Sequence, residues 1–144
     1  MKAIHNRENE KWIKVDALED VFFYTLYKFN AYWIAGEVSE RIAKRIYRDL
    51  DVNVHGYKIE INGKGMKHFF SEHFNEKIRG QRKISVQDIK MVLEVVNNAS
   101  EITFGNNMNR LLFITRFPNG LFHFVVEINE KRKTLLGKAF WIKA

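Results

Sequence analysis

The chain has 144 residues and a mass of 17.1 kDa, and its composition is 46% hydrophobic and 28% charged, with a single proline. This is enough apolar material for one buried core and too much for a disordered chain. There is no cysteine, so a disulfide framework and a thiolate metal site are both excluded.

Positive charge is unevenly distributed along the chain. Residues 1–62 contain 10 Lys and Arg against 10 Asp and Glu, whereas residues 63–144 contain 14 against 7. The second part therefore carries the whole formal net charge of +7. A basic surface concentrates polyanions, so RNA, DNA or an acidic protein is an expected partner. Many basic proteins bind no nucleic acid, so charge alone leaves the partner open.

The most apolar window, residues 21–35, is interrupted by Lys28 and Asn30 and is shorter than the roughly 20 apolar residues of a membrane-spanning helix. It is better explained as a core helix that ends near Gly36. The residues with helical spacing are Leu18, Val21, Phe22, Thr25, Phe29, Tyr32 and Trp33. Met1 is not followed by the features of a signal peptide. We therefore expect a soluble, cytoplasmic protein with no membrane partner.

Three further elements follow in chain order. Residues 39–50 have apolar side chains every four positions, which predicts an amphipathic helix. The alternating stretch YKIEI, residues 57–61, indicates a short strand. Asn62 and Gly63 provide turn chemistry before a third helix that contains the stretch GMKHFFSEHF, residues 65–74.

The stretch SVQDIKMVLEVVNN predicts a fourth helix, because Ser85 and Asp88 have capping-box spacing before an apolar stripe. Asp88 is better explained as a cap than as a catalytic acid. Four predicted strands follow, over residues 101–104, 110–117, 121–129 and 134–143. Helices first and an antiparallel meander last predict an α+β fold, with N-terminal helices packed on a C-terminal four-stranded antiparallel sheet.

Two histidines stand among the phenylalanines of the third helix. They are five positions apart and point about 140° away from each other, so they cannot form the i, i+4 zinc pair of an HExxH motif. His73 falls on the apolar face of the helix, with Phe69 and Phe74, and His68 falls on the polar face. Both a half-buried structural histidine and an acid/base group fit this pattern.

From about Val38 to the end, the order and spacing of the segments resemble the phage-borne ribonuclease-like domains of the barnase/EndoU/colicin/RelE-like (BECR) superfamily. The segments that carry the resemblance are VSERIAKRIYRDLDVNV, HGYKIEI, HFFSEHF, RGQRKISVQDIKMVLEVVNNASEI and the terminal antiparallel sheet. Such domains occur in phage head-associated and polyvalent proteins and are related to bacterial toxins. The resemblance implies a nuclease domain over residues 38–144, with residues 1–37 as a helical extension packed on it.

The resemblance also implies a metal-independent endoribonuclease without a cofactor. In such an enzyme a base takes the proton of a ribose 2′-hydroxyl, an acid protonates the leaving 5′-oxygen, and cations stabilise the charge on the phosphate. Histidines that titrate near neutral pH suit the two proton transfers. His68 matches the first histidine of the family's motif and His73 the second, so either can be the base or the acid.

One departure from the related domains concerns the last strand. Lys138 stands in GKAFW, where related domains tend to carry a small hydroxyl residue before a small residue and an aromatic. Lysine can hold a phosphate but cannot replace a hydroxyl group atom for atom. We include Lys138 among the catalytic candidates, and we note that the departure also fits an altered substrate or lost activity.

Basic side chains outside the histidine stretch are candidate phosphate contacts. Arg79 and Arg82 lie in a basic loop before the capped helix, where two guanidinium groups can grip a phosphate or simply be solvated. The candidates from the sheet are Arg110, Arg116, Lys133 and Thr134. Alternation puts Arg110 and Arg116 on one face of their strand, and Thr134 and Lys138 on one face of theirs. His123 and Trp141 also lie in the basic sheet region, although core packing is their default explanation.

Two alternatives to an active ribonuclease stay open. The first is a catalytically inactive relative that binds nucleic acid or an acidic protein. The second is a phage structural module that docks through the N-terminal aromatic helix. An acidic inhibitor protein is a further expected partner, since a basic ribonuclease is toxic to the cell that makes it.

Overall fold

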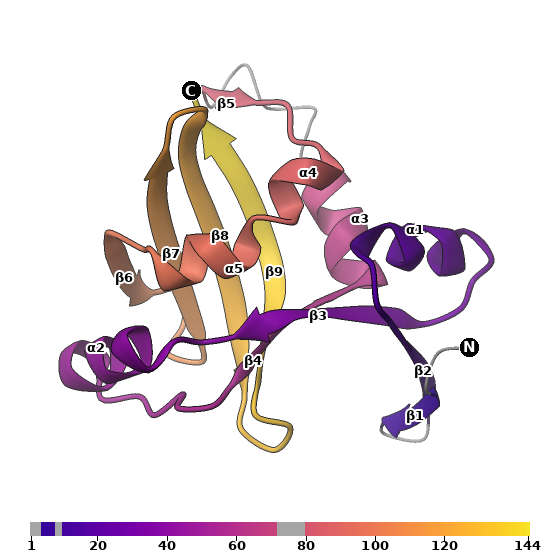
Figure 1. Ribbon diagram of the computed structural model, residues 1–144, viewed down its shortest axis with the longest axis horizontal. Helices are drawn as coiled ribbons and strands as arrows, with labels where there is room; N and C mark the ends of the chain where they lie inside the picture. The colour runs from indigo at the N-terminus through magenta and orange to yellow at the C-terminus, as the bar shows by residue number, and fades with distance from the viewer. Residues whose placement is uncertain (1–3, 8–9, 72–79) are drawn as a thin grey trace.

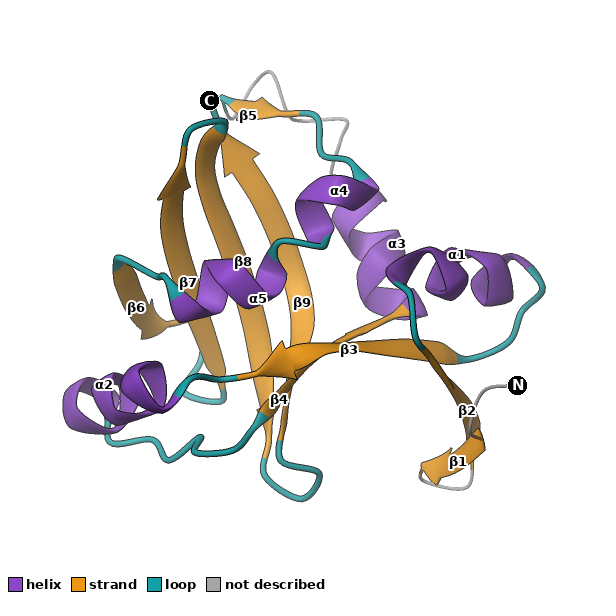
Figure 2. Cartoon of the chain, in the orientation of Figure 1, coloured by secondary structure: helices purple, strands orange, loops and turns teal. Residues whose placement is uncertain are grey.

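The computed structural model describes residues 4–7, 10–71 and 80–144. Within these ranges the strands are β1 (Ile4–Arg7), β2 (Glu10–Val15), β3 (Ala31–Glu37), β4 (Lys58–Asn62), β5 (Gln81–Arg82), β6 (Glu101–Phe104), β7 (Arg110–Phe117), β8 (Gly120–Asn129) and β9 (Thr134–Lys143). The helices are α1 (Leu18–Leu26), α2 (Glu40–Leu50), α3 (Gly63–Ser71), α4 (Val86–Ile89) and α5 (Val92–Asn97). All the strands belong to one mixed sheet of order β1-β2-β3-β4-β9-β8-β7-β6, and β5 pairs with the end of β9 (Figures 1 and 2).

The four C-terminal strands confirm the sequence prediction. β6 to β9 begin and end within one residue of the predicted ranges and pair in antiparallel order. In β7 the alternate residues Leu111, Phe113 and Thr115 are buried, as a strand with one face on the core requires. Arg110 and Arg116 therefore lie on the opposite face of β7, as the alternation predicted.

The predicted N-terminal helix is wrong beyond Leu26. α1 ends there, Lys28 adopts a left-handed backbone conformation with φ 63°, and Ala31 starts β3. β3 lies between β2 and β4, and its first two residues are buried. The aromatic-rich segment fits both a period of 3.6 and a period of 2, and its pairing with two neighbouring strands selects the strand. The N-terminal part is thus largely strand, and the sheet is wider than four strands.

β4 joins the two parts of the sheet. The predicted strand at residues 57–61 is confirmed as β4, and its residues Lys58–Glu60 pair in parallel with Thr134–Leu136 of β9. These partners are more than 70 residues apart along the chain. No local pattern reports such a pairing, which explains why the sequence predicted only the antiparallel half of the sheet.

The helices after β3 match their predictions in part. α2 starts after Ser39, whose side chain accepts a hydrogen bond from the Ile42 N–H, as a capping serine does. The Ser85–Asp88 capping box is present at the start of α4. The single predicted fourth helix is instead two short helices, α4 and α5, which break at Lys90 and Met91. The break leaves Ile89 and Val92 fully buried on the same core.

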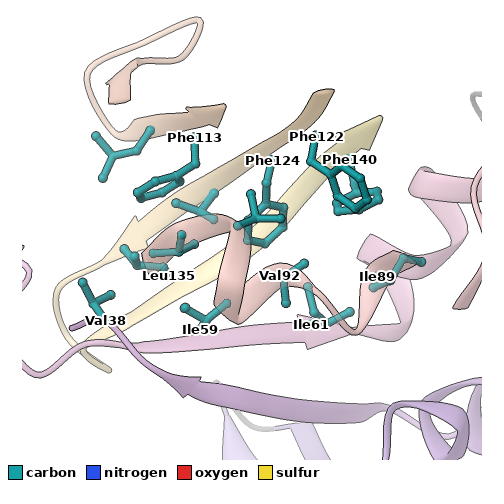
Figure 3. Packing of buried hydrophobic residues seen from close by; sticks show 14 of the residues in the cluster. Val38, Ile59, Ile61, Ile89, Val92, Phe113, Phe122, Phe124, Leu135 and Phe140 are labelled. Carbon is teal, nitrogen blue, oxygen red and sulfur yellow. The ribbon is translucent and has the colours of Figure 1, made fainter. Parts of the chain in front are cut away.

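The main core lies between one face of the sheet and the helices that cross it (Figure 3). Phe113, Phe122, Phe124 and Phe140 project from the sheet toward Val92 of α5. Burial of such side chains contributes about 1.5–3 kcal/mol each. Because successive residues of a strand point to opposite faces, the polar positions between these aromatics lie on the other face of the sheet, away from α5.

Candidate active site

Three of the predicted site residues line one cleft of about 530 Å³: His68 of α3, Arg110 of β7 and Lys138 of β9. The remaining lining residues are Trp12, Asn62, Lys64, Gly65, Leu136 and Gly137. Four segments that are far apart in the sequence thus contribute side chains to the same hollow. The cleft forms where β4 and β9 separate. They pair only as far as Glu60 and Leu136, and α3 begins three residues after Glu60.

α3 presents a basic face to this cleft. Met66 and Phe69 are buried, whereas Lys64 and His68 are exposed on the opposite side. Lys64 and His68 are four residues apart, which makes them neighbours on one helix face. The helix also begins at the cleft, and the Asn62 side-chain oxygen accepts a hydrogen bond of 2.9 Å from the Gly65 N–H. The positive end of the helix dipole therefore adds to the charge of Lys64.

Two glycines bring α3 close to β9. A Cβ on Gly65 would lie 2.8 Å from the carbonyl oxygen of Gly137. A Cβ on Gly137 would lie 2.7 Å from Cδ1 of Ile61 and 3.0 Å from the Phe124 ring. Neither position has room for a side chain. The close approach of these backbones places His68 beside the outer face of β9.

A β-bulge sets the position of Lys138. In the β8–β9 ladder Val125 pairs with Ala139 and Val126 pairs with Gly137, so Lys138 is an extra residue without a partner across the ladder. Leu135 before the bulge and Phe140 after it both face the core, although they are five residues apart. The bulge thus changes the alternation of the strand and leaves Lys138 on the cleft face. Bulges commonly serve to aim side chains next to active sites.

Arg110 closes the other side of the cleft. It pairs across the sheet with Glu127, which in turn pairs with Leu136. At about 4.8 Å per strand, Arg110 lies roughly 10 Å from Leu136. Its Nη2 is 3.4 Å from the Glu127 carboxylate, and its buried Nε has no hydrogen-bond partner in the described part of the chain. The Arg110 guanidinium is thus only weakly held by Glu127, through one contact of 3.4 Å.

The electrostatic character of the cleft is positive. Its ionisable lining residues are Lys64, His68, Arg110 and Lys138, and none of the described lining residues is a carboxylate. Two carboxylates lie next to the cleft. Glu60 is fully buried and its Oε1 is 2.9 Å from Arg132, whereas Glu127 lies between Arg110 and Leu136 in the sheet and offsets part of the Arg110 charge. A cleft of this kind suits an anion such as a phosphodiester.

A family model matches residues 36–144, most of the chain. It is PBECR3, described as phage-Barnase-EndoU-ColicinE5/D-RelE like nuclease3. The chain belongs to this nuclease family. The resemblance inferred from the order of the sequence segments is thereby confirmed. Comparisons with curated proteins and with solved structures find no match. The matched range of this PBECR3 domain contains every ionisable residue of the cleft, whereas Trp12 lies outside it.

Other predicted site residues of the PBECR3 domain lie away from the cleft. The Arg82 guanidinium is 2.9 and 3.0 Å from the two Asp88 oxygens, and its Nε donates to the Asn119 carbonyl at 3.0 Å. Burial raises the pKa of Asp88, but hydrogen bonds from Arg82 and Ser85 outweigh it and hold that pKa below its ordinary value. Arg82 thus stabilises the capped start of α4.

The remaining sheet candidates lie at the strand ends. Arg116 is six residues from Arg110 on β7, which corresponds to about 20 Å. Lys133 is exposed in the turn before β9, and Thr134 is buried at the first position of that strand. The structure brings none of these three to the cleft. His73 and Arg79 lie outside the described residues.

His123 and Trp141 form a stacked pair on the cleft side of the sheet. Their ring centroids are 4.8 Å apart and their planes differ by 11°. His123 is buried, and its Nδ1 is 3.0 Å from the Leu121 carbonyl oxygen, to which it donates. Burial lowers the pKa of His123 below its ordinary value. Neither ring lines the cleft, so the default structural explanation fits their position.

Sequence reasoning missed six lining residues of the cleft, and three of them have polar or aromatic side chains: Trp12, Asn62 and Lys64. Lys64 could have been found from its i, i+4 spacing to His68, and Asn62 from its capping position. The sequence around Trp12 does not indicate that it lies at the cleft, because β2 is placed there by its pairing with β3.

In the described part of the chain, no group of three or more His, Cys, Asp or Glu side chains is arranged to hold a metal ion. None of the described helices has the length and apolarity needed to cross a membrane.

Proposed function

We propose that this PBECR3 domain is an endoribonuclease that cleaves RNA by attack of a ribose 2′-hydroxyl on the neighbouring phosphorus, without a metal ion. The observation that supports it best is the convergence of His68 with Lys64, Arg110 and Lys138 around one cleft free of described carboxylates. Proton transfer and phosphate binding are the two requirements of this reaction, and these residue types meet both.

The proposed reaction uses one acid and one base. The base removes the 2′-hydroxyl proton, O2′ bonds to phosphorus, and the P–O5′ bond breaks as the acid gives a proton to O5′. The products carry a 2′,3′-cyclic phosphate and a 5′-hydroxyl. His68 is one of the two proton-transfer groups, and His73, five positions later in the sequence and outside the described residues, is proposed as the other. Lys64, Lys138 and Arg110 stabilise the charge that accumulates on the phosphoryl oxygens.

The test is incubation of the purified protein with tRNA and ribosomal RNA in EDTA, followed by analysis of the fragment ends. We expect discrete fragments with 2′,3′-cyclic phosphate ends. A His68→Ala variant should lose cleavage by about 10²–10⁴-fold, the usual contribution of a positioned acid or base. His55→Ala is the matched control, because His55 is exposed and lines a different hollow, beside Tyr47.

Two results would contradict this proposal. One is intact RNA at high protein concentration with folding verified by circular dichroism. The other is equal cleavage by the parent and by the His68→Ala variant, which would indicate a contaminating nuclease.

A second candidate function is a catalytically inactive relative that binds nucleic acid or protein. Lys138 favours it, because a lysine replaces the small hydroxyl residue expected from the resemblance while it still lines the cleft. In this case RNA binds at low salt and is released as salt rises, with no cleavage to lose. Salt-dependent binding without fragments would select this function.

The same positive cleft motivates the proposed partners and location. An acidic inhibitor protein would place carboxylates against Lys64, Lys138 and Arg110, as complementary charge does in tight complexes. A phage structural protein is a further proposed partner, for which the exposed aromatic side chains of α1 and the turn after it, Phe23, Tyr27 and Phe29, offer contact area. The proposed place of action is the bacterial cytoplasm, where RNA substrates are found.

A further inference from the structure

A second hollow adjoins the active-site cleft. Its volume is about 320 Å³, and it lies between the turn after α1, β2 and the start of α3. The two hollows share Trp12 and Lys64, so they are neighbours separated by these two side chains. The second hollow is lined further by Lys28, Phe29, Asn30 and Lys67.

Most of this second hollow comes from outside the matched family region. Trp12, Lys28 and Phe29 precede residue 36, where the match begins. The N-terminal segment is net neutral in sequence, yet the fold places Lys28 beside Lys64 and Lys67 of α3. None of the described lining residues is a carboxylate. The N-terminal segment thus extends the positive surface of the nuclease domain.

The two hollows are held in a fixed relation. Thr25 near the end of α1 occupies the space where a Cβ on Gly63 would lie, so α1 and α3 are in direct contact. Backbone N–H groups of Lys28 and Phe29 donate to the carbonyls of Thr25 and Tyr24 at 3.0 and 2.9 Å. These bonds hold Lys28 in its left-handed conformation at the rim of the hollow.

The chemistry of this hollow matches a nucleotide. Lysines supply attraction for a phosphate, and two aromatic residues, Trp12 and Phe29, line the hollow and are of the kind on which bases stack. An extended, flexible strand can pass from one hollow to the next around Trp12, whereas stacked and paired bases of a duplex cannot turn toward an aromatic wall.

We propose that residues 12–31, together with Lys64 and Lys67 of α3, form a second subsite, which binds the nucleotide one position beyond the two that the cleaved linkage joins in single-stranded RNA. This proposal rests on the proposed ribonuclease function for its substrate. It assigns to the N-terminal segment a role in selecting single-stranded substrates longer than two nucleotides.

The test compares cleavage of a dinucleotide, which reaches only the cleft, with cleavage of a hexanucleotide of the same central sequence. In the parent, kcat/KM should be higher for the hexanucleotide. The ratio of the two values should fall about tenfold in Trp12→Ala, as expected when a stacking ring is removed. Lys28→Ala should also lower it, whereas Lys83→Ala, a charge-matched change at an exposed residue outside both hollows, should not.

Binding of a 2′-deoxy hexanucleotide, which cannot be cleaved by this route, separates this proposal from the function it rests on. Lys28→Ala should weaken that binding and reduce the slope of log Kd against log salt by about 0.7, the value for one phosphate contact on a single strand. If the parent cleaves no RNA but Lys28→Ala still weakens binding and lowers the salt slope, the subsite proposal stands and the ribonuclease proposal is wrong. Cleavage by the parent with the same length ratio in Lys28→Ala and Trp12→Ala would overturn the subsite alone.

Discussion

Gly65 of α3 lies against the backbone of Gly137 in β9, so closely that a Cβ on Gly65 would be 2.8 Å from the Gly137 carbonyl oxygen. This contact joins the helix that carries His68 to the strand that carries Lys138. A Gly to Ala change inside a helix usually stabilises it by about 0.5–1 kcal/mol. Here we expect Gly65→Ala to destabilise the protein by about 1–3 kcal/mol, because the added methyl group overpacks the interface. Urea denaturation measures the change, and a more stable variant would contradict the contact.

Lys138, which is half-buried, should contribute more to RNA affinity than the exposed lysines outside the cleft do. Its side chain lines the cleft with Lys64 and Arg110, and the Glu127 carboxylate beside the cleft contacts Arg110. We expect Lys138→Ala to weaken the binding of a 2′-deoxy oligonucleotide and to lower the salt slope by about 0.7. Fluorescence anisotropy across a salt series measures both values. Lys83→Ala is the control, and equal effects in the two variants would remove Lys138 from the binding site.

The buried ion pair under the sheet face should be costly to break from one side. Glu60 is fully buried and its Oε1 is 2.9 Å from Nη1 of Arg132, whose guanidinium lies over the Tyr32 ring. We expect Arg132→Ala to lower the free energy of unfolding by about 3–5 kcal/mol, since the carboxylate stays buried without this cation. The double variant Glu60→Gln with Arg132→Ala should recover part of the loss. A loss below about 1 kcal/mol would show that Arg132 is not what stabilises the buried Glu60 carboxylate.

Asp88 should make stability depend on acidic pH. Its pKa in the folded protein lies below the ordinary value because of hydrogen bonds from Arg82 and Ser85, which outweigh burial. As pH falls below about 4, Asp88 is therefore protonated in the unfolded state before it is protonated in the folded state. The contribution of Asp88 is fully present above that pH and is lost as pH falls through the folded pKa. Thermal unfolding between pH 2 and 6 should show a smaller acid-induced loss in Asp88→Asn than in the parent.

His123 should add a second pH dependence, in a higher range. Burial lowers its pKa, with a smaller contribution in the same direction from Lys143 and an opposing one from Glu101. The unfolded state therefore takes up a proton near pH 6.5 while the folded state stays neutral. The contribution is present above about pH 6.5 and is lost as pH falls. His123→Phe keeps a ring against Trp141 and should reduce the loss of stability between pH 7.5 and 5.5, whereas His55→Gln should not. An unchanged loss in His123→Phe would show that His123 is not its source.

The elements with local signals could be predicted from the amino-acid sequence. The period-four stripe of α2, the Ser85–Asp88 capping box and the alternating strands β6 to β9 each depend on residues a few positions apart. Side-chain periodicity and capping act within one or two turns of chain, so the sequence reports them directly. The ordered string of such segments also sufficed to indicate the nuclease family.

Features that depend on residues far apart in the chain could not be predicted in this way. Ala31–Glu37 is a strand because β2 and β4 pair with it on both sides, although its apolar spacing also fits a helix. His68 and Lys138 line the same cleft because β4 pairs in parallel with β9 and then separates from it at α3. The bulge at Lys138 and the approach of Trp12 likewise follow from pairing between strands. Such pairings are selected by the burial of the whole sheet, and a local window of sequence contains no record of them.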